Sequence, residues 1–477
     1  MFTTPAPKVD SIDTIAAIST PPGRGGIGIV RLSGPDALTL AAHLLQLSQP
    51  LDATAAHAHT RFARVLDPAD PTRTLDDCLV TAFHAPHSYT GDTLVEIAAH
   101  GSPVILDALL RNVLATGERL GLAVRLANPG EFTQRAFLAG RIDLTQAEAV
   151  HDLIAAQTLH QARVAAQQLG GALSRRVASA KEALLHLIAL LEAGMDFASG
   201  ELDDVDVVPP TQIADFIARV RTPLEALAAT FQRGQLLRNG AAIAIAGRPN
   251  AGKSSLFNRL LERERAIVTP VAGTTRDTLE ESLSLDGIPI RLIDTAGLRT
   301  TATGEGIDEA EQHGIARTHE ALADADLILH ILDVTAQDIT APTPTPEIDL
   351  TGRPHIVIHN KIDLLPNDPA REQHTPIRTS ALTGEGLDTL RSAILAQLNA
   401  AGSLADSGLL NNLRQQQSVT DTLTALTAAA EANTACLPHE LILLDLHMAL
   451  RALDSLTGVT TTDDILARIF STFCIGK

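Results

Sequence analysis

The 477-residue sequence predicts a multidomain α/β protein, in which a doubly wound, mainly parallel sheet is inserted into a helical domain behind a smaller N-terminal α/β domain. Three observations lead to this prediction. The length exceeds what one hydrophobic core ordinarily serves. Strand-like and helical runs alternate through residues 239–400, which is the rhythm of a doubly wound sheet. Leu and Ala recur at helical intervals both before and after that segment.

The N-terminal domain is expected to cover residues 1–127. It contains short β-like runs bounded by turn signals, such as Ile27–Leu32 after a Pro-Pro-Gly-Arg-Gly-Gly turn, Cys78–Phe83 and Leu94–Ala98. This mixture of short β-like runs and turn signals is interpreted as an α/β domain.

Two separated segments, residues 128–238 and 401–477, are expected to form one all-α domain. From Thr145 to about Met195 the helical spacing is broken only at Gly170-Gly171, which predicts a long antiparallel pair of helices. A further helix is expected from Thr211 to about Leu237. The C-terminal segment would complete this helical layer, which makes the segment between them an insertion, and insertions are tolerated because domain termini often lie close together.

The inserted domain, residues 239–400, contains four strand-like runs at Ala242–Ala246, Ile288–Ile293, Leu327–Leu332 and Ile356–His359. Helical segments separate them, so a parallel sheet covered by helices is expected.

Composition narrows the function classes. The formal net charge of −19 argues against binding nucleic acid by bulk charge, so any RNA contact needs a local basic patch or a partner. Cys78, Cys436 and Cys474 have no paired spacing, which favours a reducing compartment over disulfides or a zinc site. No apolar run is long enough to cross a bilayer, and Met1–Asp10 has no signal-like apolar core. A soluble, cytoplasmic protein without membrane contact is therefore expected.

The strongest motif is Gly247–Ser254, a G-x4-G-K-S sequence between an apolar strand and a helical run. In that context the backbone N–H groups form a phosphate cradle. Lys253 would contact the β- and γ-phosphates, and the Ser254 hydroxyl would ligate Mg2+. The alternative is a Gly-rich turn with a solvated lysine, which the complete motif in this context disfavours.

Three further segments follow in the order that a Ras-like P-loop GTPase domain requires: Thr274–Asp277, Asp294–Gly297 and Asn360–Asp363. Asp294 would hold the metal through water, and Asp363 can accept two hydrogen bonds from guanine, which adenine cannot offer. The backbone amide of the Ser380-Ala381 segment could reach guanine O6, although Leu382 stands where many GTPases have Lys. The candidate GTP-binding residues are Asn250, Ala251, Gly252, Lys253, Ser254, Ser255, Thr269, Thr274, Thr275, Asp294, Thr295, Ala296, Gly297, Asn360, Lys361, Asp363, Ser380, Ala381 and Leu382.

Leu298 occupies the position where Ras-like enzymes carry the glutamine that orients the attacking water. Another source of catalysis is therefore needed. Asn250 could ligate a monovalent cation beside the phosphates and so supply positive charge. An asparagine chosen for its turn conformation is the alternative reading of Asn250.

The sequence resembles the MnmE (TrmE) family of tRNA-modification GTPases over nearly its whole length. The resemblance rests on Thr20–Gly28, Tyr89–Gly91 with Glu96 and His100-Gly101, Pro129–Thr133, Arg135–Phe137, Asp143-Leu144, Gln146–Ala149 and Cys474–Lys477. It implies an N-terminal folate-binding and dimerising domain, a discontinuous helical domain and an inserted G domain. It also implies a homodimer that acts with a flavoprotein partner of the MnmG family, which uses FAD and NADH. Together they would install an aminomethyl-type group at carbon 5 of the wobble uridine of certain tRNAs, with a one-carbon unit from a tetrahydrofolate derivative (the 5-formyl or 5,10-methylene form).

Site residues follow from this resemblance by position. The potassium ligands would be Asn250, Thr269, Val271 and Thr274, and the magnesium ligands Ser254 and Thr275. The folate contacts would be Arg31, Glu96, Arg141 and Lys477, a set suited to a pterin edge and a glutamate tail. Arg141 replaces a lysine common in the family, which keeps the charge and changes the geometry. Ordinary surface salt bridges are the alternative for these four residues.

Two residues have open roles. Glu311 resembles the glutamate that orients the attacking water, which makes it a catalytic candidate beside Lys253 and Asp294, but neighbouring acidic residues compete for that assignment. Cys474 has no thiolate-stabilising neighbour in sequence, so a packed thiol is favoured over a nucleophile.

A ribosome-assembly or regulatory GTPase is the alternative function. It would share every nucleotide motif, but it would not need the Pro-Pro-Gly-Arg-Gly-Gly block or the Cys-Ile-Gly-Lys end.

Overall fold

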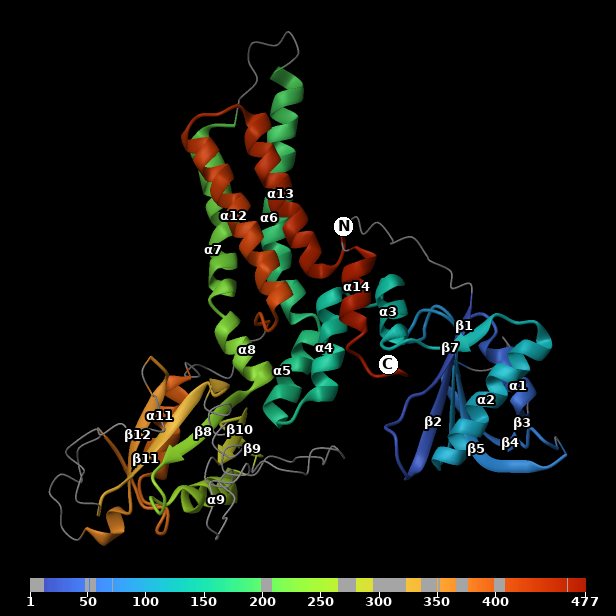
Figure 1. The fold of residues 1–477 in the computed structure, drawn as a ribbon. Helices are drawn as coiled ribbons and strands as arrows, with labels where there is room; N and C mark the ends of the chain where they lie inside the picture. The colour runs from blue at the N-terminus through green and yellow to red at the C-terminus, as the bar shows by residue number, and fades with distance from the viewer. Residues whose placement is uncertain are drawn as a thin grey trace, which may run out of the picture. The chain divides into compact units, whose positions relative to one another are not determined.

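The computed structural model describes residues 13–47, 51, 57–70, 72–198, 208–264, 280–294, 323–335, 350, 352–365, 376–398, 408–460 and 462–477. The chain divides into two compact units, one of residues 1–151 with 454–477 and one of residues 152–453 (Figure 1). Within the described ranges, no helix is both long and apolar enough to span a lipid bilayer.

The first unit is built on a seven-stranded sheet of order β3-β4-β5-β6-β2-β1-β7. Its strands are β1 (Thr14–Ile18), β2 (Gly25–Ser33), β3 (Leu45–Leu47), β4 (His59–Leu66), β5 (Thr74–Phe83), β6 (Leu94–Gly101) and β7 (Val124–Leu126). All neighbours are antiparallel except β1 and β7, which are parallel. Alternate side chains of β2, β5 and β6, such as Val30, Val80 and Ile97, are buried in one core with α1 (Ala37–Leu44) and α2 (Pro103–Leu120).

The C-terminal end of the chain completes this first unit. Helices α3 (Glu131–Leu138), α4 (Leu144–Ala155) and α14 (Asp463–Phe470) contribute to a second apolar cluster that includes Leu144, Phe470 and Phe473. The backbone N–H of Phe132 donates to the carbonyl of Lys477 at 3.2 Å. The first and last parts of the sequence therefore form one folded unit.

The second unit contains a six-stranded sheet of order β13-β12-β11-β8-β10-β9 (Figure 1). Its strands are β8 (Ala241–Gly247), β9 (Glu280–Leu285), β10 (Ile288–Asp294), β11 (Leu327–Asp333), β12 (His355–Asn360) and β13 (Ile377–Thr379). Only the β9–β10 pair is antiparallel. With α9 (Lys253–Glu264), the short helix η1 (Ile362–Leu364) and α11 (Leu387–Gln397), this arrangement confirms the predicted mainly parallel α/β fold.

The same unit contains the helices α5 (Leu159–Leu169), α6 (Ala172–Ala198), α7 (Pro210–Ala228), α8 (Phe231–Asn239) and α12 (Leu413–Thr434), and most of α13 (His439–Thr457). Helix α7 packs against both α6 and α12, so segments before and after the inserted sheet share one helical layer.

Two predicted helices are shorter than expected. The spacing from Thr145 to Met195 breaks at residues 156–158 as well as at Gly170-Gly171, because Thr158 starts a new helix with a capping box. The helix expected from Thr211 to Leu237 ends at Ala228 and restarts at Phe231.

Candidate nucleotide site

The loop between β8 and α9 needs glycine at two positions. Gly247 has a φ of +154°, and a Cβ there would lie 2.4 Å from the carbonyl oxygen of Ile331. Gly252 has a φ of +91°, and a Cβ there would lie 2.2 Å from Nδ2 of Asn360. Both contacts are too close for any side chain. The loop therefore has the conformation and the close backbone packing that a phosphate-binding loop requires.

The side chains that follow this loop are placed at its centre. Lys253 is 8% exposed and its Nζ donates to the carbonyls of Gly247 and Arg248, each at 2.9 Å. The Ser254 hydroxyl donates to Oδ2 of Asp294 at 3.0 Å, and Asp294 is buried at the end of β10. A hydroxyl and a carboxylate are oxygen ligands of the kind that Mg2+ prefers. The described residues include no group of three or more His, Cys, Asp or Glu placed for a metal ion.

Asn360 joins the phosphate loop to the segment after β13. Its Nδ2 donates to the carbonyl of Ala251 at 3.0 Å, and its Oδ1 accepts from the Ala381 N–H at 3.1 Å and the Thr379 hydroxyl at 3.3 Å. Asn360 is 1% exposed, so these bonds form away from water, where an unpaired amide would be costly. Asn360 therefore links the phosphate loop to the segment after β13.

Asp363 and Ser380 lie side by side, with the Ser380 hydroxyl donating to Oδ1 of Asp363 at 2.5 Å. Asp363 borders a cavity of about 480 Å3. Its lining residues are Gly252, Ser255, Asn258, Arg259, Glu262, Asn360, Lys361, Asp363, Leu364, Ala381 and Leu382. Asp363 presents a carboxylate to this cavity, and a carboxylate can accept hydrogen bonds from guanine. The N–H groups of Ser380 and Ala381, which were expected to reach guanine O6, donate instead to the carbonyl of Glu385 and to Oδ1 of Asn360.

Two residues of this site were missed by sequence reasoning. Asp333, at the end of β11, accepts a hydrogen bond from Nζ of Lys361 at 2.6 Å, and it is paired in register with Asn360. Burial alone would raise the pKa of Asp333, but the hydrogen bonds from Lys361 and Thr335 outweigh it and lower that pKa. Arg259 donates to the carbonyls of Ala381 and Leu382. Asp333 could have been predicted, because an aspartate at the end of an apolar strand-like run is visible in the sequence. The partners of Arg259 could not, because they depend on tertiary structure.

Several predicted residues lie outside the described residues: Thr269, Val271, Thr274, Thr275, Thr295, Ala296, Gly297 and Glu311. Asn250 is described, and its φ of 62° lies in the left-handed region that asparagine tolerates better than most residues. This conformation is compatible with both readings of Asn250, as a cation ligand and as a turn residue.

In the first unit, three of the four predicted folate contacts, Arg31, Glu96 and Lys477, lie at or near the C-terminal end of the chain. The Arg31 guanidinium donates to Oε1 of Glu96 from Nη2 at 2.7 Å and to the carbonyl of Gly476 from Nη1 at 3.2 Å. Lys477 is bonded through its carbonyl to Phe132, whose ring lies 5.5 Å from the Arg31 guanidinium carbon. Arg31, Glu96 and the chain end are thus brought together.

Tyr89 lies near this group, whereas Arg141 is hydrogen-bonded elsewhere. Arg141 donates from Nη1 to the carbonyl of Pro86 at 2.6 Å. Tyr89 shares a hydrogen bond of 2.9 Å with Thr133, and burial raises the pKa of Tyr89 although Thr133 and the nearby Arg31 oppose that shift. Sequence reasoning used Tyr89 only as part of a family motif and did not name it as a site residue.

The fold and the nucleotide site define a class. A mainly parallel sheet carries G-x4-G-K-S between β8 and α9, an aspartate at the end of β10, and Asn-Lys-x-Asp at the end of β12. These features in this order define the P-loop GTPases, enzymes that hydrolyse GTP.

Comparison with known proteins identifies the family. The family model described as the MnmE helical domain matches residues 144–474, and the one described as the GTP-binding protein TrmE N-terminus matches residues 14–141. The tRNA modification GTPase MnmE of Koribacter versatilis is 52% identical over 98% of this chain and 99% of its own length. The proteins of the same name from Nitrosomonas europaea and Chloroflexus aurantiacus are 41% and 42% identical, each over 98% of this chain and 100% of their own length. The chain belongs to the MnmE family of tRNA modification GTPases.

Among solved structures, Era from Aquifex aeolicus in complex with GDP and AlF4− is 28% identical, with a TM-score of 0.26. The similarity covers 39% of this chain and 67% of that one.

Proposed function

We propose that this protein hydrolyses GTP, with Mg2+ and K+, to drive modification of carbon 5 of the wobble uridine in certain tRNAs. The observation that carries the proposal is the bonding of Asn360 to both the phosphate loop and the segment after β13, beside the cavity that Asp363 borders. Family membership supports the tRNA substrate, because the relatives are named tRNA modification GTPases.

Each nucleotide-site residue has a defined task in this proposal. Asp363 accepts hydrogen bonds from guanine, and Lys253 exchanges its carbonyl partners for β- and γ-phosphate oxygens. Water attacks the γ-phosphorus, a new P–O bond forms, and the bond to the β-γ bridging oxygen breaks to release GDP and phosphate. Ser254 and Thr275 would hold Mg2+, which neutralises charge on the phosphates when bound.

The remaining catalytic tasks fall to potassium and to a glutamate. Asn250, with Thr269, Val271 and Thr274, would hold K+ beside the phosphates, where fixed positive charge stabilises the transition state. Glu311 would orient the attacking water. These assignments explain how a chain with Leu298 in place of the usual glutamine can hydrolyse GTP.

The first unit would bind a tetrahydrofolate derivative through Arg31, Glu96, Arg141 and Lys477. The mixture of guanidinium and carboxylate groups near the chain end suits the amide edge of a pterin and the carboxylates of its tail. Arg31→Ala should abolish binding of 5-formyltetrahydrofolate in a calorimetric titration. Arg64→Ala, which removes another sheet arginine paired with a carboxylate, should leave binding unchanged. Equal affinity in the two variants would remove Arg31 from the site.

The proposed assembly is a cytoplasmic homodimer that works with a flavoprotein of the MnmG family, which supplies FAD and NADH. Dimerisation through residues 1–127 would leave the G domains free to meet when GTP and K+ are bound. Family membership supports this arrangement.

The function is tested by the modification state of tRNA. Nucleosides from cells that lack this protein should contain unmodified wobble uridine by mass spectrometry, and the intact gene should restore the modification. Lys253→Ala should fail to restore it, because the phosphate contact is lost. Normal wobble uridine in the deleted cells would refute the proposal and favour a ribosome-assembly or regulatory GTPase.

A further inference from the structure

The hairpin formed by β9 and β10 connects the nucleotide site to the helical layer. β10 ends at Asp294, whose carboxylate accepts from Ser254, and β9 begins shortly after Thr275 in the sequence. The turn that joins the two strands, Asp286-Gly287, lies at the opposite end of the hairpin. If the end of the hairpin at the nucleotide site shifts and the hairpin moves as a rigid body, the Asp286-Gly287 turn moves with it.

The turn is held by the start of helix α5. The Thr158 hydroxyl donates to the carbonyl of Gly287 at 2.6 Å, and the same oxygen accepts from the Gln161 N–H at 3.1 Å as the cap of α5. Gly287 has a φ of +85°, and a Cβ there would lie 2.5 Å from Cβ of His160. The turn and the helix are thus in direct contact, with no room for a larger residue at Gly287.

The same helix start also holds the chain where it enters β8. Gln161 Nε2 donates to the carbonyl of Arg238 at 3.0 Å, and Nε of Arg238 donates to Oδ1 of Asp152 at 2.7 Å. Arg238 lies in the last turn of α8, just before the strand that carries the phosphate loop. Helix α5 is therefore bonded both to the hairpin turn and to the base of β8.

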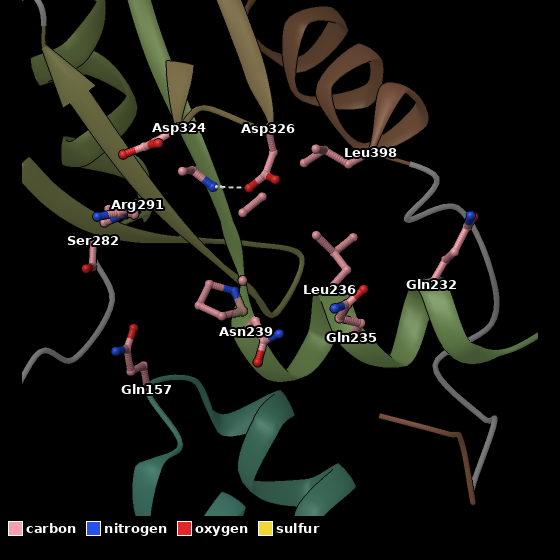
Figure 2. A pocket seen from close by; sticks show the side chains of 14 residues that line it. Gln157, Gln232, Gln235, Leu236, Asn239, Ser282, Arg291, Asp324, Asp326 and Leu398 are labelled. Carbon is pink, nitrogen blue, oxygen red and sulfur yellow. Dashed lines mark hydrogen bonds between the residues drawn. The ribbon is translucent and has the colours of Figure 1, made fainter. Parts of the chain in front are cut away.

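Beside these contacts lies a cavity of about 560 Å3. Figure 2 shows Ser282 and Arg291 of the hairpin on one side, with Gln157 and Asn239 at its helical border. The hairpin is therefore not close-packed on this side, although β10 stays hydrogen-bonded to β8 along Ile290–Asp294. The contacts of α5 with Gly287 and with Arg238 join this helix to the sheet beside the cavity.

We propose that Thr158 and His160 are positioning residues that couple the β9–β10 hairpin to the helical layer, so that the nucleotide state changes the stability of α5. The inference rests on the proposed binding of GTP at Lys253 and Ser254. It adds the residues through which the effect of the nucleotide reaches the helices.

The test separates the cap of α5 from the bond to Gly287. Thr158→Ser retains both. Thr158→Asp retains a good N-cap, but a carboxylate cannot donate to the Gly287 carbonyl. Gly287→Ala disturbs the same contact from the hairpin side through its clash with His160. Hydrogen exchange of residues 159–169 is measured in the full-length protein with GDP and with a non-hydrolysable GTP analogue plus K+.

In the parent protein and in Thr158→Ser, exchange of α5 should differ between the two nucleotides by about two- to tenfold, the size expected from one hydrogen bond. In Thr158→Asp and Gly287→Ala that difference should disappear. Neither residue borders the nucleotide cavity, so both variants should still bind GTP, with the ratio of GTP-analogue to GDP affinity changed by no more than the same two- to tenfold factor.

Two results would overturn the coupling: an undiminished difference in both Thr158→Asp and Gly287→Ala, or no difference in a parent protein that binds both nucleotides. If titration shows that the parent binds neither nucleotide, the proposed function itself is wrong and the coupling is lost with it.

Discussion

Replacing Asn360 with Ala should weaken the sheet domain of the second unit and its nucleotide binding together. The substitution removes three hydrogen bonds, to Ala251, Thr379 and Ala381, from a side chain that is 1% exposed. At about 0.5–1.5 kcal/mol net for each bond, the loss is about 1.5–4.5 kcal/mol. GTP affinity should fall as well, because the phosphate loop and the segment after β13 would no longer be held in one geometry.

The assay must report on this part of the chain. The sequence has no Trp, and its single Tyr is Tyr89 in the first unit, so intrinsic fluorescence does not follow the six-stranded sheet. Hydrogen exchange of β8 and β12 does follow it. A loss of 1.5–4.5 kcal/mol should accelerate exchange of their slowest amides by about one to three orders of magnitude. A titration with a fluorescent GDP analogue gives the affinity.

Asn258→Ala is the matched control. Asn258 is an exposed asparagine of α9 that lines the same cavity, so its removal should change stability by no more than about 0.5 kcal/mol. Asn360→Asp adds a second check, since it keeps an oxygen acceptor for Ala381 and places a carboxylate against the Ala251 carbonyl. If Asn360→Ala exchanges no faster than Asn258→Ala, the three bonds do not hold the site together.

Three further predictions concern the nucleotide site. Asp363→Asn should lower GTP affinity and shift preference toward xanthosine nucleotides, since the pairing is reversed; unchanged GTP affinity in a titration would place Asp363 outside the base pocket. Hydrolysis should be faster in K+ than in Na+ at equal ionic strength, and Asn250→Ala should remove the difference; equal rates for the parent protein in the two salts would contradict the cation role. The pKa of Asp333 is lowered in the folded state, so its stabilising effect is present above its ordinary value of 3.8 and lost as the pH falls through the lowered pKa. Calorimetry should therefore show Asp333→Asn unfolding at a lower temperature than the parent at neutral pH, with the two converging in acid; a constant gap would show that ionisation of Asp333 is not involved.

The second unit shows how far the pattern of a sequence predicts a fold. The four strands predicted in residues 239–400 all occur. Their sequences are short apolar runs between turn signals, which is the pattern typical of strands in a buried parallel sheet. Strand β9, Glu280–Leu285, was not predicted, since its polar positions lower the apolar signal of an edge strand. The break before α5 was missed although the sequence carries a signal for it, because Thr158 with Gln161 three residues later is the capping-box pattern of a helix start.

Contacts between distant residues were beyond the reach of sequence spacing, and the end of the chain shows why. Gly476 has a φ of +95°, and a Cβ there would lie 2.5 Å from the carbonyl oxygen of Ile18. Its own carbonyl accepts from the Ser19 hydroxyl at 3.0 Å and from Arg31 at 3.2 Å. The Cys-Ile-Gly-Lys ending, which entered only through family resemblance, therefore has a physical reason: only glycine lets the chain end lie against β1 and reach Arg31. A side chain at position 476 would separate the chain end from Arg31. The hydrogen bond between Arg31 and Glu96 would remain, because these two residues are paired in register on the neighbouring strands β2 and β6.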